Sequence, residues 1–359
     1  MFFASDNGLG ASDKVMQAIS AANGGARLGY GNDDATKAVV SKLCDLFERE
    51  VGAYMVATGT AANGLALSTM TPPWGIVLCH DESHVIEDEC CGPEFFTGGA
   101  KLVGIPGRGA KITAEALSAT IASLGRRVPH NAPIHALSIT QSTELGQVYS
   151  VEEVKALSAI ARANGLGVHM DGARFANAVA ALGCTPAEIT WKAGVDVLSF
   201  GTTKGGGLAC EALIYFDPAK GAEMVRRRMR AGHLLSKHRF LAAQMDAFLD
   251  GGHWLDLARH ANAAAQRLAK GLASIPGVRL PIVPEANGLF PIFRQEIVDA
   301  LKAEGAAFYP WPDKGLPEAE RARPGEQMMR LVTSFATRDE DIDRFLAIAA
   351  EAARPLAAE

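Results

Sequence analysis

Short apolar runs alternate with longer stretches of helical periodicity through the first two-thirds of this 359-residue sequence. Seven runs are interpreted as strands, at residues 53–57, 76–79, 101–105, 134–139, 167–170, 195–200 and 212–216. Helical patterns lie between several of them, over residues 36–50, 113–124 and 151–164, and a capping box of Ser150 and Glu153 begins the last. This repetition predicts a mainly parallel sheet with helices on both faces, an α/β fold.

The pattern changes after about Asp246. We predict a long alanine-rich helix over 254–272, helices over 295–304 and 338–353, and short segments at 278–283, 288–293 and 330–334. A Pro-rich stretch lies at 309–317, and the charged segment 312–325 is expected to form a surface loop. The predicted domains are therefore a large α/β domain, residues 1–246, and a smaller C-terminal α+β domain, residues 247–359.

Composition and charge exclude several classes of protein. The 35 basic and 40 acidic residues give a net charge of −5. The chain therefore lacks the excess of positive charge that would attract nucleic acids or anionic membranes. No apolar run approaches the ~20 residues of a membrane span. The first residues lack a secretory signal, and the six cysteines show no paired spacing, so we expect a cytoplasmic protein.

Residues able to bind a ligand follow three of the predicted strands. Gly59 and Thr60 lie in a small-residue turn before a helix, where free N–H groups form an anion site. Asp171 ends a strand and precedes Arg174, and Lys204 lies in a glycine-rich turn, where a lowered pKa would make it nucleophilic. The structural alternatives are an ordinary strand–helix turn, an N-capping aspartate beside a surface arginine, and a solvated lysine.

The segment His80-Asp81-Glu82-Ser83-His84 has two histidines four residues apart, as in zinc-binding helices. His80 closes an apolar strand, however, so the two rings are not expected to share a helix face. We predict no metal site here. A metal-dependent hydrolase using His80, His84 and Glu87 is kept as an alternative hypothesis.

Together, the three strand ends and a histidine favour one chemistry. Pyridoxal 5′-phosphate needs N–H and hydroxyl donors for its phosphate and a carboxylate for its pyridine nitrogen. It also needs a lysine for its aldehyde and a flat partner for its ring face. The sequence supplies all four types of residue in one order along the chain, so we predict this cofactor.

On these residues the sequence resembles the L-threonine aldolases of the β-eliminating lyase group, which are fold-type I pyridoxal phosphate enzymes. It is most similar to the low-specificity branch that includes phenylserine aldolases. The matching stretches are 5–7, 30–33, 59–63, 84–96, 170–175, 183–188, 201–204, 285–288 and 330–333. The resemblance implies retro-aldol cleavage of L-threonine, L-allo-threonine or L-phenylserine to glycine and an aldehyde. The alternatives are a pyridoxal phosphate racemase or β-eliminating lyase, and a non-catalytic vitamin-binding regulator.

The resemblance also implies roles at the cofactor. Lys204 would form the imine with its aldehyde, Asp171 would pair with the pyridinium nitrogen, and His84 would stack on the ring. Gly59 and Thr60 would hold the phosphate.

For the amino-acid substrate, the resemblance implies that Ser5, Arg174 and Arg330 bind the α-carboxylate. The base that removes the β-hydroxyl proton would be His84 or a second histidine, for which His130 is the candidate. The residues after the lysine, Gly205-Gly206-Gly207-Leu208-Ala209-Cys210, depart from the pattern of many relatives.

Two further residues are expected at a subunit interface. The resemblance implies that Tyr30 approaches the site from a neighbouring subunit, and that Arg228 reaches the phosphate across the same interface. The protein is thus expected to be a homodimer or homotetramer with shared sites.

Overall fold

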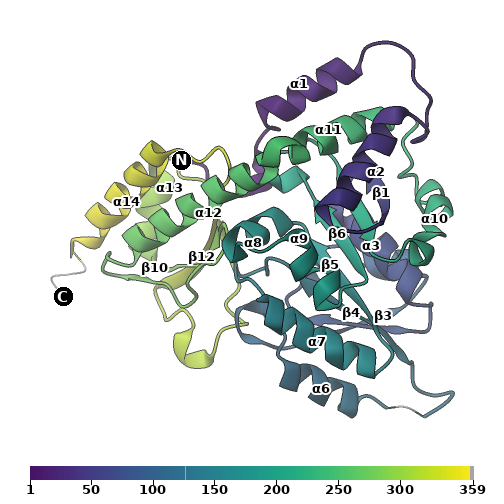
Figure 1. The fold of residues 1–359 in the computed structure, drawn as a ribbon. Helices are drawn as coiled ribbons and strands as arrows, with labels where there is room; N and C mark the ends of the chain where they lie inside the picture. Colours follow the sequence, from purple (N-terminus) through teal and green to yellow (C-terminus); the bar gives the residue numbers. More distant parts are fainter. Residues whose placement is uncertain (126, 356–359) are drawn as a thin grey trace.

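Seven strands form the larger sheet, each at the position of a predicted apolar run (Figure 1). The structure is a computed structural model that describes residues 1–125 and 127–355. The strands are β1 (Gly52–Val56), β2 (Ile76–His80), β3 (Lys101–Ile105), β4 (Ile134–Thr140), β5 (Gly167–Gly172), β6 (Val197–Gly201) and β7 (Glu211–Tyr215). Their order is β1-β7-β6-β5-β4-β2-β3, and only β7 runs against both its neighbours. The chain between β6 and β7 is too short for a parallel crossover, which takes a dozen residues or more. The mainly parallel sheet is confirmed.

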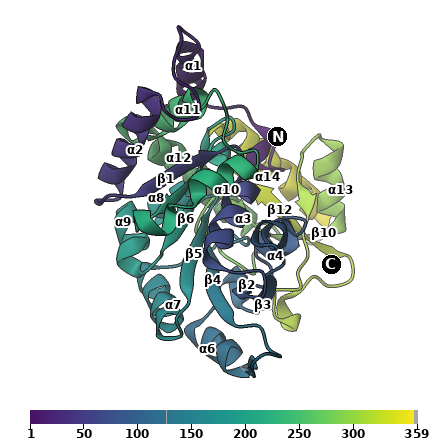
Figure 2. The ribbon, with the colours of Figure 1, turned by 90° about the vertical axis from the view of Figure 1, so that its right-hand side faces the viewer.

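Helices cover both faces of this sheet, as Figure 2 shows. On one face, α3 (Gly59–Met70) is buried over most of its length and packs against β5, β6 and β7. On the other face lie α2 (Asp34–Leu46), α6 (Ala114–Ser123), α7 (Val151–Ala163), α8 (Phe175–Leu182) and α11 (Arg239–Leu249). Side chains of neighbouring strand residues point to opposite faces of the sheet. Leu78 packs in the core beneath α7, and Val77 packs in the core beneath α3. The capping box of Ser150 and Glu153 is confirmed at the start of α7.

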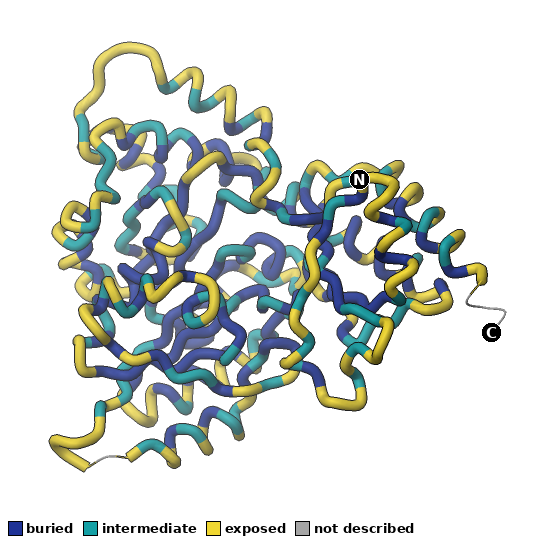
Figure 3. The backbone as a smooth tube through the Cα atoms, turned by 180° about the vertical axis from the view of Figure 1, so that it is seen from behind, coloured by how far each residue is buried: buried dark blue, intermediate teal, exposed yellow. Residues whose placement is uncertain are grey.

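A smaller antiparallel sheet has its own core, and Figure 3 shows buried backbone in the middle of both bodies. Its strands are β8 (Val278–Arg279), β9 (Gly288–Leu289), β10 (Ile292–Arg294), β11 (Tyr309–Pro310) and β12 (Glu326–Val332), and its helices are α12 (His253–Leu272), α13 (Gln295–Ala303) and α14 (Asp339–Ala353). Phe3 packs edge-on against Phe345 at 5.2 Å between ring centroids, so the first residues of the chain join this second core. The boundary after residue 246 stays a prediction.

The predicted surface loop at 312–325 lies against the larger body. Lys314 contacts Glu87 at 3.0 Å, and Leu316 is buried in a small apolar cluster with Phe290. Arg321 donates to the carbonyl oxygens of Lys314 and Leu316 and so closes the loop on itself. No helix among the described residues is long and apolar enough to cross a bilayer.

The carboxyl ends of β2, β4, β5 and β6 meet at one edge of the larger sheet, because these strands are parallel. The loops that follow them therefore lie together. At Gly201, the last residue of β6, a Cβ atom would lie 2.6 Å from the carbonyl oxygen and 2.7 Å from the Cα of Ala173. Glycine thus lets the backbone after β6 contact the backbone after β5, which sets the spacing between Lys204 and Asp171.

We expect Gly201→Ala to lower the free energy of unfolding by about 1–3 kcal/mol, the usual cost of forcing extra atoms into a packed interior. Denaturant unfolding followed by circular dichroism measures this change. Gly10→Ala is the matched control, because a Cβ atom there meets no atom within 4 Å, and it should change stability by less than about 0.5 kcal/mol. Equal stability of the two variants would show that the backbone contact at Gly201 is absent.

Candidate active site

Two cavities at the carboxyl edge of the sheet share Asn7, His84 and Lys204 in their linings. The first, of about 220 Å³, we call the arginine cavity. Its lining also includes Ser5, Asp88, Ser142, Glu144, Arg174, Phe290, Trp311 and Arg330. The second, of about 390 Å³, we call the aspartate cavity. Its lining also includes Gly59, Thr60, Asn63, Glu89, Asp171 and Glu211. Eight of the eleven residues predicted from the sequence lie in these two linings.

Asp171 ends β5 and is buried in the aspartate cavity, as its position in the strand predicts. Its Oδ1 accepts the backbone N–H of Ala173 at 2.9 Å, and its Oδ2 accepts Nδ2 of Asn63 at 2.9 Å. The same Nδ2 donates to Glu89 Oε1 at 2.9 Å. Burial, and then the charge of Asp171, raise the pKa of Glu89 to about 7. The Oδ1 of Asn63 and the Oε2 of Glu89 are buried without a hydrogen-bond partner, which suits a polar ligand in this cavity.

Gly59 and Thr60 form the first turn of α3 at the rim of the aspartate cavity. Thr58 caps this helix by accepting the N–H of Ala61. A Cβ atom on Gly59 would meet nothing within 4 Å, so the space above the turn is open. The start of a 12-residue helix, with exposed hydroxyls beside it, forms an anion site of the kind that the sequence predicts.

Lys204 lies in a short turn after β6 and lines both cavities. The turn is held in place because the Thr202 side chain donates to the Cys210 carbonyl oxygen and the Thr202 N–H donates to Glu211 Oε2 at 3.0 Å. Burial, followed by the charge of Arg174, lowers the pKa of Lys204. Burial also raises the pKa of Glu211 to about 7. A larger fraction of the lysine is therefore an uncharged, nucleophilic amine at neutral pH.

Arg174 is held by a buried carboxylate on the first segment of the chain. Its Nε and Nη2 donate to the two oxygens of Asp6 at 2.7 and 2.9 Å, which leaves Nη1 outside the pair. Burial would raise the pKa of Asp6, but the guanidinium outweighs this and holds that pKa below its usual value. Asn287 of the smaller body also donates to Asp6, at 3.2 Å.

Arg330 on β12 enters the arginine cavity from the smaller body. Its guanidinium lies over the Trp311 ring, 4.8 Å from the centroid, and its Nη2 donates to the Ala4 carbonyl oxygen at 3.1 Å. Its Nε is buried without a partner. Burial and the charge of Arg174 lower the pKa of Arg330. The unpaired N–H of Arg330, with the guanidinium group of Arg174 lining the same cavity, indicates a site for a carboxylate.

His84 begins the short helix α4 (His84–Glu87). Its ring Nε2 lies 3.8 Å from Asp88 Oδ2, and its backbone N–H donates to Glu144 Oε1 at 2.9 Å. Burial, and then the charge of Lys204, lower the pKa of His84, which favours the neutral ring. Ser5 lies in the same cavity and caps the first turn of the chain.

The structure does not bring His130 to this site within one chain, so this prediction is corrected here. His130 lies in an exposed turn before β4, and the start of a parallel strand faces the opposite edge of the sheet from Asp171. The hollow beside that turn, of about 650 Å³, is lined by residues such as Trp74 and Pro129, with no titratable group in its described lining.

Tyr30 and Arg228 also lie outside the linings of both cavities. Tyr30 is exposed, and its N–H donates to the Ser236 carbonyl oxygen at 3.0 Å. Arg228 on α10 (Met224–Arg230) is buried and donates to the Met55 carbonyl oxygen at 2.9 Å. Their expected roles require a second chain and stay predictions.

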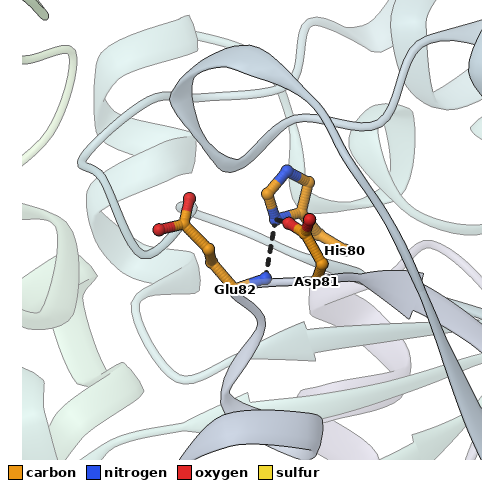
Figure 4. A group of neighbouring side chains, drawn as sticks. All are labelled: His80, Asp81 and Glu82. Atoms are coloured by element: carbon orange, nitrogen blue, oxygen red, sulfur yellow. Dashed lines mark hydrogen bonds and ion pairs between the residues drawn. The ribbon is translucent and has the colours of Figure 1, made fainter. Parts of the chain in front are cut away.

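Among the described residues, one group of three potential metal ligands lies close together: His80, Asp81 and Glu82, within 4.8 Å of one another (Figure 4). The Nδ1 of His80 accepts the backbone N–H of Glu82, and its Nε2 bonds the Gly107 carbonyl oxygen, both at 3.0 Å. Both ring nitrogens are thus engaged, and neither is free to bind a metal ion. His84 and Glu87 are not part of the group, which weakens the hydrolase alternative.

Comparison with known proteins gives the same family as the sequence motifs. Residues 3–294 match the family model of the β-eliminating lyases. A low specificity L-threonine aldolase from Pseudomonas sp. (strain NCIMB 10558) is 42% identical over 313 residues, which cover 87% of this chain and 90% of that protein. The chain belongs to the β-eliminating lyase family.

Solved structures agree with this assignment. Leishmania major threonine aldolase is 26% identical and superposes with a TM-score of 0.89 over 98% of both chains. Serine palmitoyltransferase of Sphingomonas wittichii, 18% identical, superposes with a TM-score of 0.72 over 100% of this chain and 88% of that one, a likeness of fold alone. The predicted fold-type I architecture, with a large mixed sheet and a small antiparallel one, is confirmed.

Several residues of this lyase site received no role from the sequence, among them Asp6, Asn63, Glu89, Glu144 and Glu211. Two of them stand inside stretches that carry the family resemblance, Asp6 beside Ser5 and Asn63 at the end of the small-residue turn. Glu144 follows a predicted strand, and the carboxyl ends of strands are where an α/β sheet binds its ligands, so that rule could have indicated it. Glu211 begins β7 and reaches the same edge because this strand is antiparallel to its neighbours, which the sequence did not predict.

We expect Glu89→Gln to change stability in a pH-dependent way. A free glutamate titrates near 4.5 and the folded one near 7, so between these values the folded wild type binds more protons than the unfolded chain. Wild-type stability therefore falls relative to Glu89→Gln as the pH rises from 4.5 to 7, by on the order of 3 kcal/mol.

Thermal unfolding of ligand-free protein at pH 5 and pH 8 measures this difference. Glu115→Gln, at an exposed position on α6, is the control and should shift equally at both values. A Glu89→Gln difference that does not depend on pH would contradict the raised pKa.

Proposed function

We propose that this protein is a pyridoxal 5′-phosphate-dependent aldolase of low specificity, which cleaves L-threonine, L-allo-threonine and L-phenylserine to glycine and an aldehyde. One observation carries the proposal: Lys204, Asp171 and an open helix start line one cavity, and two arginines line a second cavity that shares the lysine. The first set suits the cofactor and the second suits an amino-acid carboxylate. The 42% identity to a low specificity L-threonine aldolase over most of both chains supports the substrate class.

The donors in the aspartate cavity fit the cofactor. Gly59 and Thr60 would hold its phosphate, Asp171 its ring nitrogen, Lys204 its aldehyde carbon and His84 one face of its ring. The orphaned polar atoms of Asn63 and Glu89 fit a ligand that carries its own hydrogen-bonding groups. When bound, pyridoxal phosphate supplies an electron-withdrawing ring that stabilises negative charge at the substrate Cα.

The arginine cavity would hold the substrate by its α-carboxylate. Arg174 offers Nη1, because its other edge is occupied by Asp6, and Arg330 offers the unpaired Nε. The guanidinium groups of Arg174, from the larger body, and Arg330, from the smaller one, would hold the carboxylate at two points. This restricts how the substrate can turn about its Cα atom. That orientation decides which bond at Cα is broken.

A base is needed for the β-hydroxyl proton, and the sequence left His84 and His130 open. His84 lines both cavities and its lowered pKa favours the neutral ring, whereas His130 of the same chain lies at the opposite edge of the sheet. The geometry of one chain therefore favours His84 in contact with the substrate.

We further propose a homodimer or homotetramer of cytoplasmic location, in which Tyr30 and Arg228 of one chain approach the site of another. Exposed apolar side chains support an interface near the site: Phe95 on α5 (Gly92–Thr97) is 79% exposed and Met229 on α10 is 58% exposed. Both helices pack against α3, whose first turn borders the aspartate cavity.

We expect purified protein with the cofactor to release acetaldehyde from L-threonine and L-allo-threonine and benzaldehyde from L-phenylserine, with glycine formed in equal amount. Aldehyde-coupled assays and amino-acid chromatography measure these products. Pyruvate from L-serine, or inversion of L-alanine without aldehyde, would instead establish the β-eliminating lyase or the racemase. Activity lost to a chelator in colourless protein would establish the metal hydrolase.

We expect borohydride reduction of the cofactor-loaded protein, followed by peptide mapping, to place the cofactor on the peptide that contains Lys204. The modification should be lost in Lys204→Ala. It should be kept in Lys192→Ala, because Lys192 is a surface residue paired with Glu48. Modification of another lysine with Lys204 untouched would overturn the proposed cofactor site.

A further inference from the structure

Glu144 is a carboxyl group in the arginine cavity with one oxygen unused. It follows β4 at the carboxyl edge of the sheet, and its Oε1 accepts the backbone N–H of His84 at 2.9 Å. Its Oε2 is buried and makes no hydrogen bond of ordinary length, although the Thr140 hydroxyl at the end of β4 lies close enough to favour the charged form. An unpaired buried polar atom costs about 1–3 kcal/mol, a cost that a hydroxyl donor held in the cavity lined by Glu144 would relieve.

We propose that Glu144 is a catalytic residue that accepts the β-hydroxyl proton of the substrate and returns a proton to Cα. This inference rests on the proposed aldolase function. It assigns to the carboxyl group the proton transfer that would otherwise fall to His84, and leaves the imidazole ring free to pack against the cofactor.

The proton balance of the reaction requires such a group. Cleavage removes one proton from the hydroxyl oxygen, whose electron pair forms the aldehyde C=O bond as the Cα–Cβ bond breaks. The pair from the broken bond remains with Cα and takes up one proton to give glycine. A carboxylate that accepts the first proton and supplies the second ends the cycle unchanged, and no further reactant is needed.

The surroundings of Glu144 adjust it to this task. Burial, with a smaller contribution from the charge of Asp171, raises the pKa of Glu144 to about 7. The group is therefore partly ionised at neutral pH, where an acid–base catalyst works best. The charged and titratable groups that line the cavity with it are His84 and Asp88 at α4, Arg174 before α8, Lys204 after β6 and Arg330 on β12. Outside the cavity, Asp171 at the end of β5, Cys79 on β2 and Tyr149 before α7 also interact with its charge.

Two substitutions of Glu144 distinguish proton transfer by its side chain from its hydrogen bond to the backbone N–H of His84. Glu144→Gln keeps an oxygen that can accept the His84 N–H but cannot exchange a proton, and Glu144→Ala removes both functions. We expect Glu144→Gln to bind the cofactor at Lys204 as wild type does and to lower kcat about 10²–10⁴-fold with little change in KM. Activity in Glu144→Gln close to wild type, with loss only in Glu144→Ala, would overturn the proposal and leave Glu144 a positioning residue.

Glu82→Gln is the matched control. The Oε2 of Glu82 is also buried without a partner and its pKa is also raised by burial, but Glu82 lines neither cavity. Its variant should keep wild-type kcat and KM. A fall in kcat equal to that of Glu144→Gln would show that a buried glutamate near α4 matters for structure alone, which would overturn the assignment.

Two measurements of pH dependence complete the test, one of kcat/KM and one of infrared spectra. A base must be ionised, so wild-type kcat/KM should rise with pH through about 7, and this rise should disappear in Glu144→Gln. Infrared difference spectra of wild type minus Glu144→Gln, taken on protein without cofactor, should show a protonated carboxyl band that is lost over the same range. A rise that persists in Glu144→Gln, or a band that does not titrate near 7, would contradict the proposal. Wild type that releases no aldehyde would instead refute the aldolase function itself.

Discussion

The ion pair between Asp6 and Arg174 fixes the position of three separate parts of the chain around one cavity. Asp6 belongs to the first segment, Arg174 follows β5 of the larger sheet, and Asn287 of the smaller body donates to the same carboxylate. A buried pair of this kind gains little over apolar packing, but loss of one partner costs about 3–5 kcal/mol because the other charge is left unpaired. The pair therefore makes the arrangement specific: Arg174 points one edge at Asp6 and the other at the cavity.

Desolvation dominates the chemistry of the groups around this pair. Burial raises the pKa of Glu89, Glu144 and Glu211 to about 7, so each is only partly ionised at neutral pH, and Lys204 is shifted toward its neutral amine by the same cause. The site thus accumulates ionisable groups without accumulating full charges. Negative groups on an incoming cofactor and substrate then meet the guanidinium groups and the start of α3 rather than a ring of carboxylates.

Periodicity predicted the larger sheet because its central strands are buried on both faces and read as continuous apolar runs. All seven strands lie where the runs are, and the site residues at their ends, Asp171 and Lys204, follow from the rule that ligands bind at carboxyl ends. The prediction that His130 lies at the site was based on the family resemblance alone. Because His130 precedes β4, which is parallel to β5, it lies at the edge of the sheet opposite Asp171 within the same chain. The partners of these residues could not be predicted, because contacts such as Asp6 with Arg174 join segments far apart in sequence.

The two cavities are built from different parts of the molecule, which under the proposed function separates cofactor chemistry from substrate choice. The aspartate cavity takes its lining from the first segment and from residues 57–211, all on or beside the larger sheet. The arginine cavity adds Phe290, Trp311 and Arg330, which belong to the smaller body. A change at Phe290 or Trp311 alters the space beside the substrate while Asp171, Lys204 and the start of α3 stay as they are. Under the proposed function, sequence variation in the smaller body can therefore change which aldehyde is released without disturbing the groups proposed to hold the cofactor.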